Sequence, residues 1–206
     1  MRFYLSSYKL GNEVRKLKKM LPRNRRTAFI PNAADPWAKS ERTNMTNITD
    51  MAQLRAIGLK PEVFDLKQYF GKAKELEKKL DDFGVIWVRG GNTFVLRQAM
   101  RLSGFDIAFK KLMHKRDMLY GGYSAGICIL APSLHGIELM DDKTQKPYGK
   151  RSRVIYEALG VLDYYIVPHY KSDHPETKLA DKAVQYFINN KMLFRTLRDG
   201  EVIVTE

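Results

Sequence analysis

A serine stands between two glycines in the segment Gly122-Tyr123-Ser124-Ala125-Gly126, which has the pattern G-x-S-x-G. An apolar run over 118–123 precedes it and an apolar helix start follows. A serine at a sharp turn from strand to helix is held with its hydroxyl exposed, because small flanking residues let the two elements pack closely. The amide of Ala125 would then face the oxyanion of an acyl-transfer reaction. The pattern alone also fits a turn without chemistry.

A second glycine turn follows another apolar run. The residues Arg89-Gly90-Gly91-Asn92-Thr93 come directly after Phe83–Val88 and before a helix. Adjacent glycines at a strand end let the backbone approach a ligand and direct N–H groups at it. We therefore expect Gly91 to supply a second oxyanion donor and Asn92 to orient substrate. The alternative is a plain turn, with Asn92 or Thr93 as an ordinary helix N-cap.

A serine nucleophile needs a base, and the chain has 4 histidines. His114 lies among basic residues on a helix face, which predicts a surface position. His135 lies in an irregular segment, and no pattern there predicts its position. His169 follows an apolar strand expected over 163–168, which ends at the same sheet edge as Ser124 if the strand is parallel. We predict His169 as the base, with His174 as the second candidate.

The base in turn needs a carboxylate that holds the imidazole in the right tautomer. The residues alone do not choose one. Asp199 also has a structural interpretation, because Asp199-Gly200 is a common turn signal between two strand-like runs, 193–197 and 201–205, that predict a closing hairpin. The candidates that follow Ser124 are Glu138, Asp141, Asp142, Asp173, Glu176 and Asp199.

Elements that could position these residues alternate along the chain. Phe83–Val88 is a continuous apolar run, typical of a strand buried on both faces of a parallel sheet, and Gln68–Leu80 is strongly helical. Strands alternating with helices of this length predict an α/β fold: a doubly wound, mostly parallel sheet with helices on both faces. We expect one domain over residues 1–206, with both glycine turns and His169 at one sheet edge.

Composition limits the partners that we expect. Lys and Arg number 36 against 23 acidic residues, a formal charge of +13, but the positive residues are scattered along amphipathic segments as on solvated helix faces. We therefore expect no nucleic-acid partner. The single cysteine, Cys128, cannot form an internal disulfide, which fits a reducing cytoplasm. No apolar run reaches the length of a membrane span and the first residues turn polar too early for a signal peptide, so we expect no membrane association.

Four segments in combination resemble the peptidase E family of aspartyl dipeptidases, which is related to cyanophycinase. The family is marked by a G-G-G-N-T-F turn, a G-W-S-A-G elbow, a P-H-F segment and a late P-E-G segment. Their order and spacing are similar here, over nearly the whole chain. The matching segments are Val88–Phe94, Gly122–Gly126, Val167–Tyr170 and Leu197–Gly200.

This resemblance implies a fold like that of class I glutamine amidotransferases and a serine hydrolase with neither cofactor nor metal. Carried onto this chain, Ser124 is the nucleophile, His169 the base, and Gly91 and Ala125 the oxyanion hole. Asp199 stands where the family has its late glutamate. The implied substrates are small peptides, including dipeptides with an N-terminal aspartate. We expect a monomer or a homodimer.

The chain departs from the family at several positions. Arg89 replaces the first glycine of the triple, Tyr123 replaces tryptophan, and Asp199 is shorter than glutamate. Lys178 stands where the family has an arginine for the acidic side chain of the substrate. A lysine keeps that charge but loses the fork geometry of a guanidinium. The expected substrate-binding residues are thus Asn92 and Lys178.

Other functions are compatible with parts of this pattern. In esterase-like acyl hydrolases the order is serine, acid, histidine, whereas here the last histidine, His174, precedes Asp199. A glutaminase would carry cysteine at the elbow, but Cys128 lies one helical turn beyond it. The remaining alternative is a non-catalytic or regulatory relative of the same fold, whose positive charge serves nucleic acid.

Overall fold

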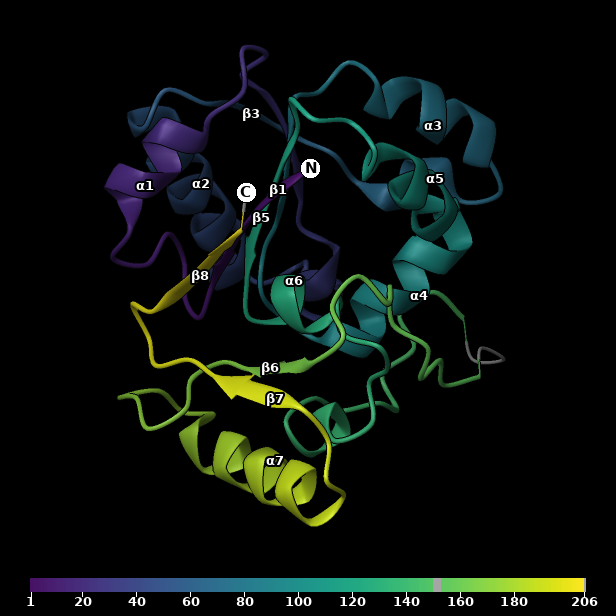
Figure 1. Cartoon of the computed structure of the whole chain (residues 1–206). Coiled ribbons are helices and arrows are strands. Elements are labelled where there is room, and N and C mark those ends of the chain that lie inside the picture. The colour runs from purple at the N-terminus through teal and green to yellow at the C-terminus, as the bar shows by residue number, and fades with distance from the viewer. Residues whose placement is uncertain (150–152, 206) are drawn as a thin grey trace.

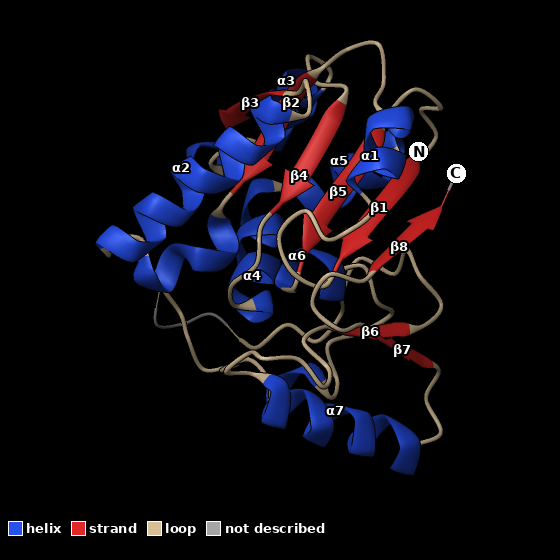
Figure 2. Ribbon diagram, turned by 90° about the vertical axis from the view of Figure 1, so that its left-hand side faces the viewer, coloured by secondary structure: helices blue, strands red, loops and turns tan. Residues whose placement is uncertain are grey.

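The computed structural model describes residues 1–149 and 153–205 and contains a six-stranded sheet of order β3-β2-β4-β5-β1-β8 (Figures 1 and 2). All neighbouring strands pair in parallel except β1 and β8, which are antiparallel. A separate two-stranded parallel sheet pairs β6 with β7. The strands are β1 Arg2–Ser6, β2 Arg26–Ile30, β3 Lys60–Val63, β4 Val85–Val88, β5 Leu119–Tyr123, β6 Tyr165–Val167, β7 Phe194–Thr196 and β8 Val202–Thr205.

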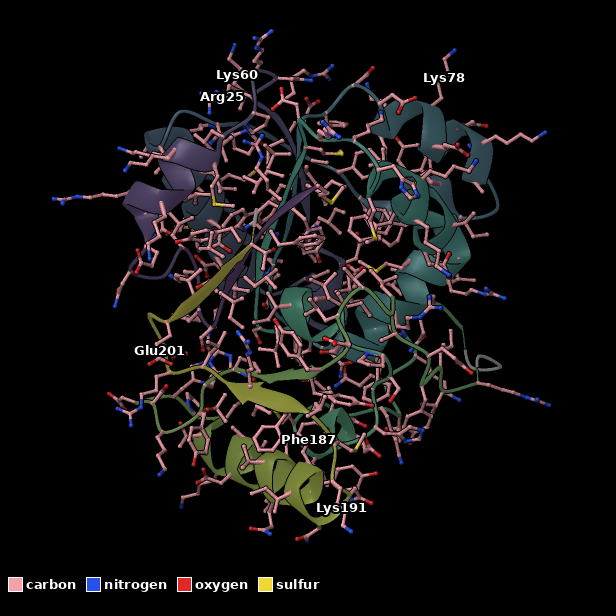
Figure 3. All side chains as sticks on the ribbon, in the orientation of Figure 1. Arg25, Lys60, Lys78, Phe187, Lys191 and Glu201 are labelled. Atoms are coloured by element: carbon pink, nitrogen blue, oxygen red, sulfur yellow. The ribbon has the colours of Figure 1, made fainter. Side chains whose placement is uncertain are left out.

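Helices cover both faces of the large sheet, as Figure 1 shows with α1 and α2 on one side and α3, α4 and α5 on the other. A last helix, α7, packs on the small sheet, with the fully buried Phe187 directed toward it (Figure 3). The α-helices are α1 Val14–Met20, α2 Glu41–Ala56, α3 Ala73–Leu80, α4 Thr93–Ser103, α5 Phe105–Leu112, α6 Ala125–Cys128 and α7 Thr177–Asn189. The 3-10 helices are η1 Asn32–Trp37, η2 Leu66–Tyr69 and η3 Ile137–Leu139.

Strand β4 shows why helices cover both faces of the large sheet. Its four residues are all buried, and successive side chains point to opposite faces. Val85 and Trp87 join the apolar cluster under α1 and α2, whereas Ile86 and Val88 join the cluster under α3 to α6. The predicted α/β fold, with a mostly parallel sheet and helices on both faces, is confirmed.

The predicted helix over Gln68–Leu80 is wrong in its first half. The chain forms the short helix η2 over Leu66–Tyr69, turns at Gly71 with a left-handed φ of 72°, and begins α3 only at Ala73. The chain is helical on both sides of this break, as a 3-10 helix before it and an α-helix after it. The turn residue separates them, because glycine adopts positive φ at little cost.

The predicted closing hairpin is also wrong. The two runs do form strands, but β7 pairs in parallel with β6, and β8 pairs antiparallel with β1. Asp199-Gly200 therefore belongs to a connection from the small sheet to the edge of the large one. Strand-forming runs pair with whichever neighbour the tertiary fold provides, and local turn signals do not determine that neighbour.

Three neighbouring strands of the large sheet end on the same edge. The residues that follow β4, β5 and β1 are Arg89-Gly90-Gly91, Ser124 and Ser7. The small sheet lies beyond this edge (Figure 1), and the Sγ of Cys128 in α6 lies 3.5 Å from the carbonyl oxygen of Ile166 in β6. The fold thus brings the segment after β6 against the edge that carries Ser124.

The surface carries basic side chains in several regions, as Lys60, Lys78 and Lys191 show at well-separated places in Figure 3. Within residues 1–149 and 153–205, no helix combines the length and the apolar composition that crossing a bilayer requires.

Candidate active site

Ser124 occupies a sharp turn between β5 and α6. Its backbone is in an unusual conformation, with φ 50° and ψ −117°, and its amide donates a hydrogen bond to the carbonyl oxygen of Ser7 at 3.2 Å. A Cβ at Gly126 would lie 2.2 Å from the carbonyl oxygen of Val88 in β4. The second glycine of the G-x-S-x-G pattern is therefore needed for α6 to pack against β4, which keeps Ser124 at the turn.

The turn after β4 needs its glycine for a similar reason. Gly91 has φ 146°, and a Cβ there would lie 2.3 Å from the carbonyl oxygen of Ala33. That oxygen accepts the amide hydrogen of Asn92 at 2.7 Å, which fixes the turn against η1. Among the described residues, the amides of Gly91 and Ala125 have no hydrogen-bond acceptor. Both can therefore donate to a bound group.

The two expected substrate-binding residues, Asn92 and Lys178, lie outside the cavity that contains Ser124. Asn92 is 2% exposed and caps α4: its side chain accepts from the Val95 amide at 3.0 Å and donates to the carbonyl oxygen of Asp142 at 2.8 Å. Lys178 is exposed on α7. Neither residue is among those that line the cavity described below.

His169 follows β6 in the left-handed region, with φ 61°, and is only 1% exposed. Two hydroxyl groups hold its backbone. Its amide donates to Ser7 Oγ at 2.9 Å, and its carbonyl oxygen accepts from Thr177 Oγ1 at 2.9 Å. These contacts place the imidazole at the edge of the large sheet, although the residue follows a strand of the small one.

Of the candidate carboxylates, Asp199 pairs with Nδ1 of His169, at 2.7 Å from its Oδ1. A carboxylate at this distance accepts the Nδ1 proton, so Nε2 is left as the basic nitrogen. Glu176 lies on the other side of the ring, with Oε2 3.8 Å from Nε2. Asp141 instead accepts from the Thr93 amide at 2.8 Å.

A cavity of about 530 Å³ brings these elements together. Ser124, His169 and Gly91 all line it, and His174 and Glu176 lie on its wall beside them. Ser124 and His169 are both among the described residues, and the structure has no hydrogen bond between the Ser124 hydroxyl and the His169 ring. In serine hydrolases without substrate such contacts are often long and shorten only in the complex.

Charges around the cavity shift the pKa values of its acid and base groups. Burial lowers the pKa of His169 below its ordinary 6.5, and the neighbouring His174 lowers it further, while Asp199 opposes both. Burial raises the pKa of Glu176 to about 7, with repulsion from Asp141 and Asp199 acting in the same direction. His169 is therefore mostly neutral near neutral pH, as a general base must be.

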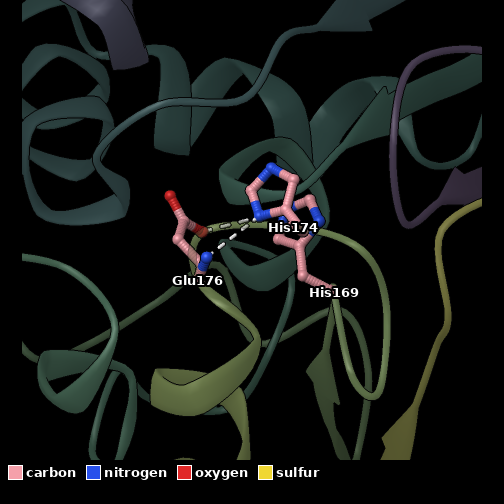
Figure 4. A group of neighbouring side chains, drawn as sticks. All are labelled: His169, His174 and Glu176. Carbon is pink, nitrogen blue, oxygen red and sulfur yellow. Dashed lines mark hydrogen bonds and ion pairs between the residues drawn. The ribbon is translucent and has the colours of Figure 1, made fainter.

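His169, His174 and Glu176 form the cluster in Figure 4 that could hold a metal ion, since one ligand atom from each lies within 4.8 Å of the others. However, the two imidazole rings are stacked 3.7 Å apart with only 8° between their planes. Imidazole binds a metal through a nitrogen lone pair in the ring plane, so two parallel stacked rings cannot share one ion without turning. This arrangement fits a metal poorly.

Two residues that the sequence did not assign to the site lie in it. Ser7 is fully buried and contacts Ser124, His169 and Asp199. Arg89 lines the cavity, where its Nε donates to the Gly90 carbonyl oxygen at 3.1 Å and its Nη1 to Asn47 Oδ1. A polar residue that ends a buried strand, and an arginine that replaces a glycine at a strand end, were the available signals.

Comparisons with known proteins show which family this chain resembles. The model of peptidase family S51 matches residues 6–206. Over 143 residues the chain is 30% identical to an uncharacterized peptidase of Listeria monocytogenes, covering 68% of this chain and 65% of the relative. Over 113 residues it is 33% identical to an uncharacterized peptidase of Pasteurella multocida, covering 55% and 52%. The chain thus matches between about half and two thirds of the length of these relatives.

Two solved structures share the fold. A putative peptidase E protein from Listeria monocytogenes superposes with a TM-score of 0.74 at 24% identity, covering 100% of this chain and 98% of that one. A peptidase from an acI-B1 actinobacterium gives a TM-score of 0.71 at 15% identity, covering 100% and 83%. With a family match that extends over nearly its whole length, the chain belongs to peptidase family S51.

Proposed function

We propose that this protein is a serine peptidase that hydrolyses small peptides, with Ser124 as nucleophile, His169 as general base and Asp199 as the acid of the triad. The observation that carries the proposal is the position of the His169 ring. Its Nδ1 is paired with Asp199 at 2.7 Å, and the residue lines the same cavity as Ser124. The whole chain would act as one catalytic domain.

The reaction is an acyl transfer. Nε2 of His169 takes the proton of the Ser124 hydroxyl while its oxygen attacks the scissile carbonyl carbon. The tetrahedral intermediate collapses as the imidazolium gives this proton to the leaving amine, which leaves an acyl-enzyme. Water, activated by the same nitrogen, then releases the acid and restores the serine. Asp199 stabilises the imidazolium and keeps the ring in one orientation.

The oxyanion requires donors that are already in place. The amides of Gly91 and Ala125 are suited to this role, because no described residue accepts their hydrogen atoms. Ala125 follows Ser124 in the chain, and Gly91 lines the same cavity as Ser124. Removing one such donor from a serine hydrolase costs about 2.7–4 kcal/mol of transition-state stabilisation. Since both donors belong to the backbone, they can be removed only by changing the turn itself.

Substrate selection rests on the charges that line the cavity. Arg42 and Arg89 supply positive charge there, whereas Lys178 lies outside it. We propose that Arg89, held by Gly90 and Asn47, is the cationic partner of an acidic substrate side chain, as in dipeptides with an N-terminal aspartate. A volume near 530 Å³ suits a small peptide.

A fluorophosphonate probe tests the nucleophile directly. The wild-type protein should be labelled and should cleave members of a dipeptide panel, while Ser124→Ala should lose both properties and keep its melting temperature. Ser6→Ala is a matched control, because the hydroxyl of that buried serine donates to the Tyr8 carbonyl oxygen and has no other hydrogen-bond partner among residues 1–149 and 153–205. Equal labelling or activity of Ser124→Ala and wild type would refute the assignment.

Two further assays beside the dipeptide panel, with p-nitrophenyl esters and with DNA or heparin, separate the competing functions. Turnover of p-nitrophenyl esters without cleavage of any peptide in the panel would indicate an esterase. Salt-sensitive binding to DNA or heparin, without labelling of Ser124, would indicate a non-catalytic relative.

A further inference from the structure

Ser7 lies at the meeting point of the nucleophile, base and acid segments. It follows β1, is fully buried, and contacts residues that come directly after β5, after β6 and from the connection between β7 and β8. We propose that Ser7 is a positioning residue that holds His169 and Asp199 in register with Ser124. This inference rests on the proposed function, since it assigns a task within the same site.

The contact with the nucleophile uses the backbone. Strands β1 and β5 pair in parallel up to Ser6 and Tyr123, so Ser7 comes beside Ser124 directly after the paired region. The Ser7 carbonyl oxygen accepts the Ser124 amide hydrogen at 3.2 Å. This hydrogen bond links the nucleophile turn to β1, and it would survive any change of the Ser7 side chain.

The contact with the base uses the hydroxyl as an acceptor. Ser7 Oγ accepts the amide hydrogen of His169 at 2.9 Å. His169 has a positive φ of 61°, a conformation that a residue with a Cβ keeps only when its surroundings enforce it. Without the hydroxyl this buried amide would have no partner, so the backbone that carries the imidazole would be free to relax.

The contact with the acid uses the same hydroxyl as a donor. Ser7 Oγ lies 2.8 Å from Asp199 Oδ1, the oxygen that also pairs with Nδ1 of His169 at 2.7 Å. A hydroxyl has one proton to give, and the carbonyl oxygen of Leu197 is farther away, at 3.3 Å. The proton therefore points at the carboxylate, while a lone pair faces the His169 amide.

The single hydroxyl thus joins two parts of the triad that no common secondary structure element carries. His169 follows strand β6, and Asp199 lies in the β7–β8 connection. Each forms a hydrogen bond with the Ser7 hydroxyl at the end of β1. Loss of the hydroxyl should loosen the relative placement of imidazole and carboxylate. The cavity walls that hold the substrate should stay as they are, since Ser7 is not among the residues that line the cavity.

The test compares Ser7→Ala, Ser7→Thr and Ser6→Ala with the wild-type enzyme on its best dipeptide substrate. Rates are expressed per active site, titrated with the fluorophosphonate probe. We expect Ser7→Ala to lower kcat about 10- to 100-fold, the loss that a hydrogen bond to a charged group accounts for, with KM changed less than about threefold. Ser7→Thr, which keeps the hydroxyl, should recover much of the rate, and Ser6→Ala should match wild type.

Different results overturn different statements. If Ser7→Ala loses titratable sites or melting temperature but keeps its kcat per titrated site, the hydroxyl is purely structural and the inference fails. It also fails if Ser7→Thr is as slow as Ser7→Ala while melting like wild type. If Ser124→Ala and His169→Ala keep wild-type activity, the proposed function itself is wrong.

Discussion

The Nδ1 atom of His169 lies 2.7 Å from Oδ1 of Asp199, although 30 residues separate them and they come from different strand connections. The contact is formed because the chain leaves β7, passes the end of β1 and only then enters β8. A hairpin over the same residues would have carried Asp199 to an exposed tip. The strand pairing therefore creates the imidazole–carboxylate pair.

Asp199→Asn should lower kcat by about 10²- to 10⁴-fold, because an amide can no longer select the Nδ1–H tautomer as a carboxylate does. KM should change little, since Asp199 does not line the cavity. Steady-state kinetics on a dipeptide substrate measure both. Asp173→Asn, in an exposed position of the neighbouring loop, is the matched control and should keep wild-type kinetics. An Asp199→Asn enzyme within threefold of wild type would remove Asp199 from the triad.

Gly91→Ala should lose both activity and stability. A Cβ would meet the Ala33 carbonyl oxygen at 2.3 Å and force a non-glycine residue to adopt φ 146°. Such strain costs about 1–3 kcal/mol, and relief of the clash would move the proposed oxyanion donor. Gly58→Ala is the control: its φ is also positive, at 95°, but nothing lies within 4 Å of the added Cβ.

Thermal unfolding and kinetics of the two glycine variants separate these effects. Gly58→Ala should lower the melting temperature alone, whereas Gly91→Ala should also lower kcat by a factor of about 10² or more. If both variants keep full activity, the Gly91 amide is no oxyanion donor.

The pH dependence of kcat/KM should report the environment of His169. A base works when it is unprotonated, and burial and His174 hold the pKa of His169 below 6.5, so activity should persist below pH 6.5 before it falls. His174→Asn removes one of these effects and exposes the ring, and both changes raise the pKa of His169. The acid limb of the profile should therefore move to higher pH.

A pH–rate profile of each variant checks this shift. His135→Asn serves as the control, because His135 stacks on Tyr156 and does not line the cavity. A limb that stays in place in His174→Asn, or that moves equally in His135→Asn, would contradict the role of His174.

Arg89→Gly should weaken the preference for acidic substrates, since the guanidinium is the buried cation that lines the cavity beside Gly90 and Gly91. We expect the ratio of kcat/KM for N-terminal Asp dipeptides over matched Asn dipeptides to fall at least tenfold, as for the loss of a charge-assisted hydrogen bond. Lys178→Ala should leave this ratio unchanged. If Lys178→Ala lowers this ratio and Arg89→Gly does not, Lys178 on α7 and not Arg89 recognises the acidic side chain.

Short-range features of the chain were accessible from the sequence. The two-sided burial of β4 follows from its unbroken apolar residues, and the sharp turn at Ser124 follows from a glycine on either side of it. The first signal is local, because a strand with only apolar residues must bury both of its faces. The second is visible as a local pattern, although the contact that requires Gly126, with the Val88 carbonyl oxygen, is long-range. The alternation of strands and helices, and hence the fold class, follows in the same way.

Only the tertiary structure decided which groups meet. Asp199 and Glu176 are both acids in polar loops, and no local pattern tells that one pairs with Nδ1 of His169 and the other faces Nε2. The part played by Ser7 is equally invisible, because a serine at the end of β1 acquires its partners only when β5, β6 and the β7–β8 connection converge on it. Such contacts join residues far apart in the sequence, and their geometry depends on strand pairing, which local propensities do not specify.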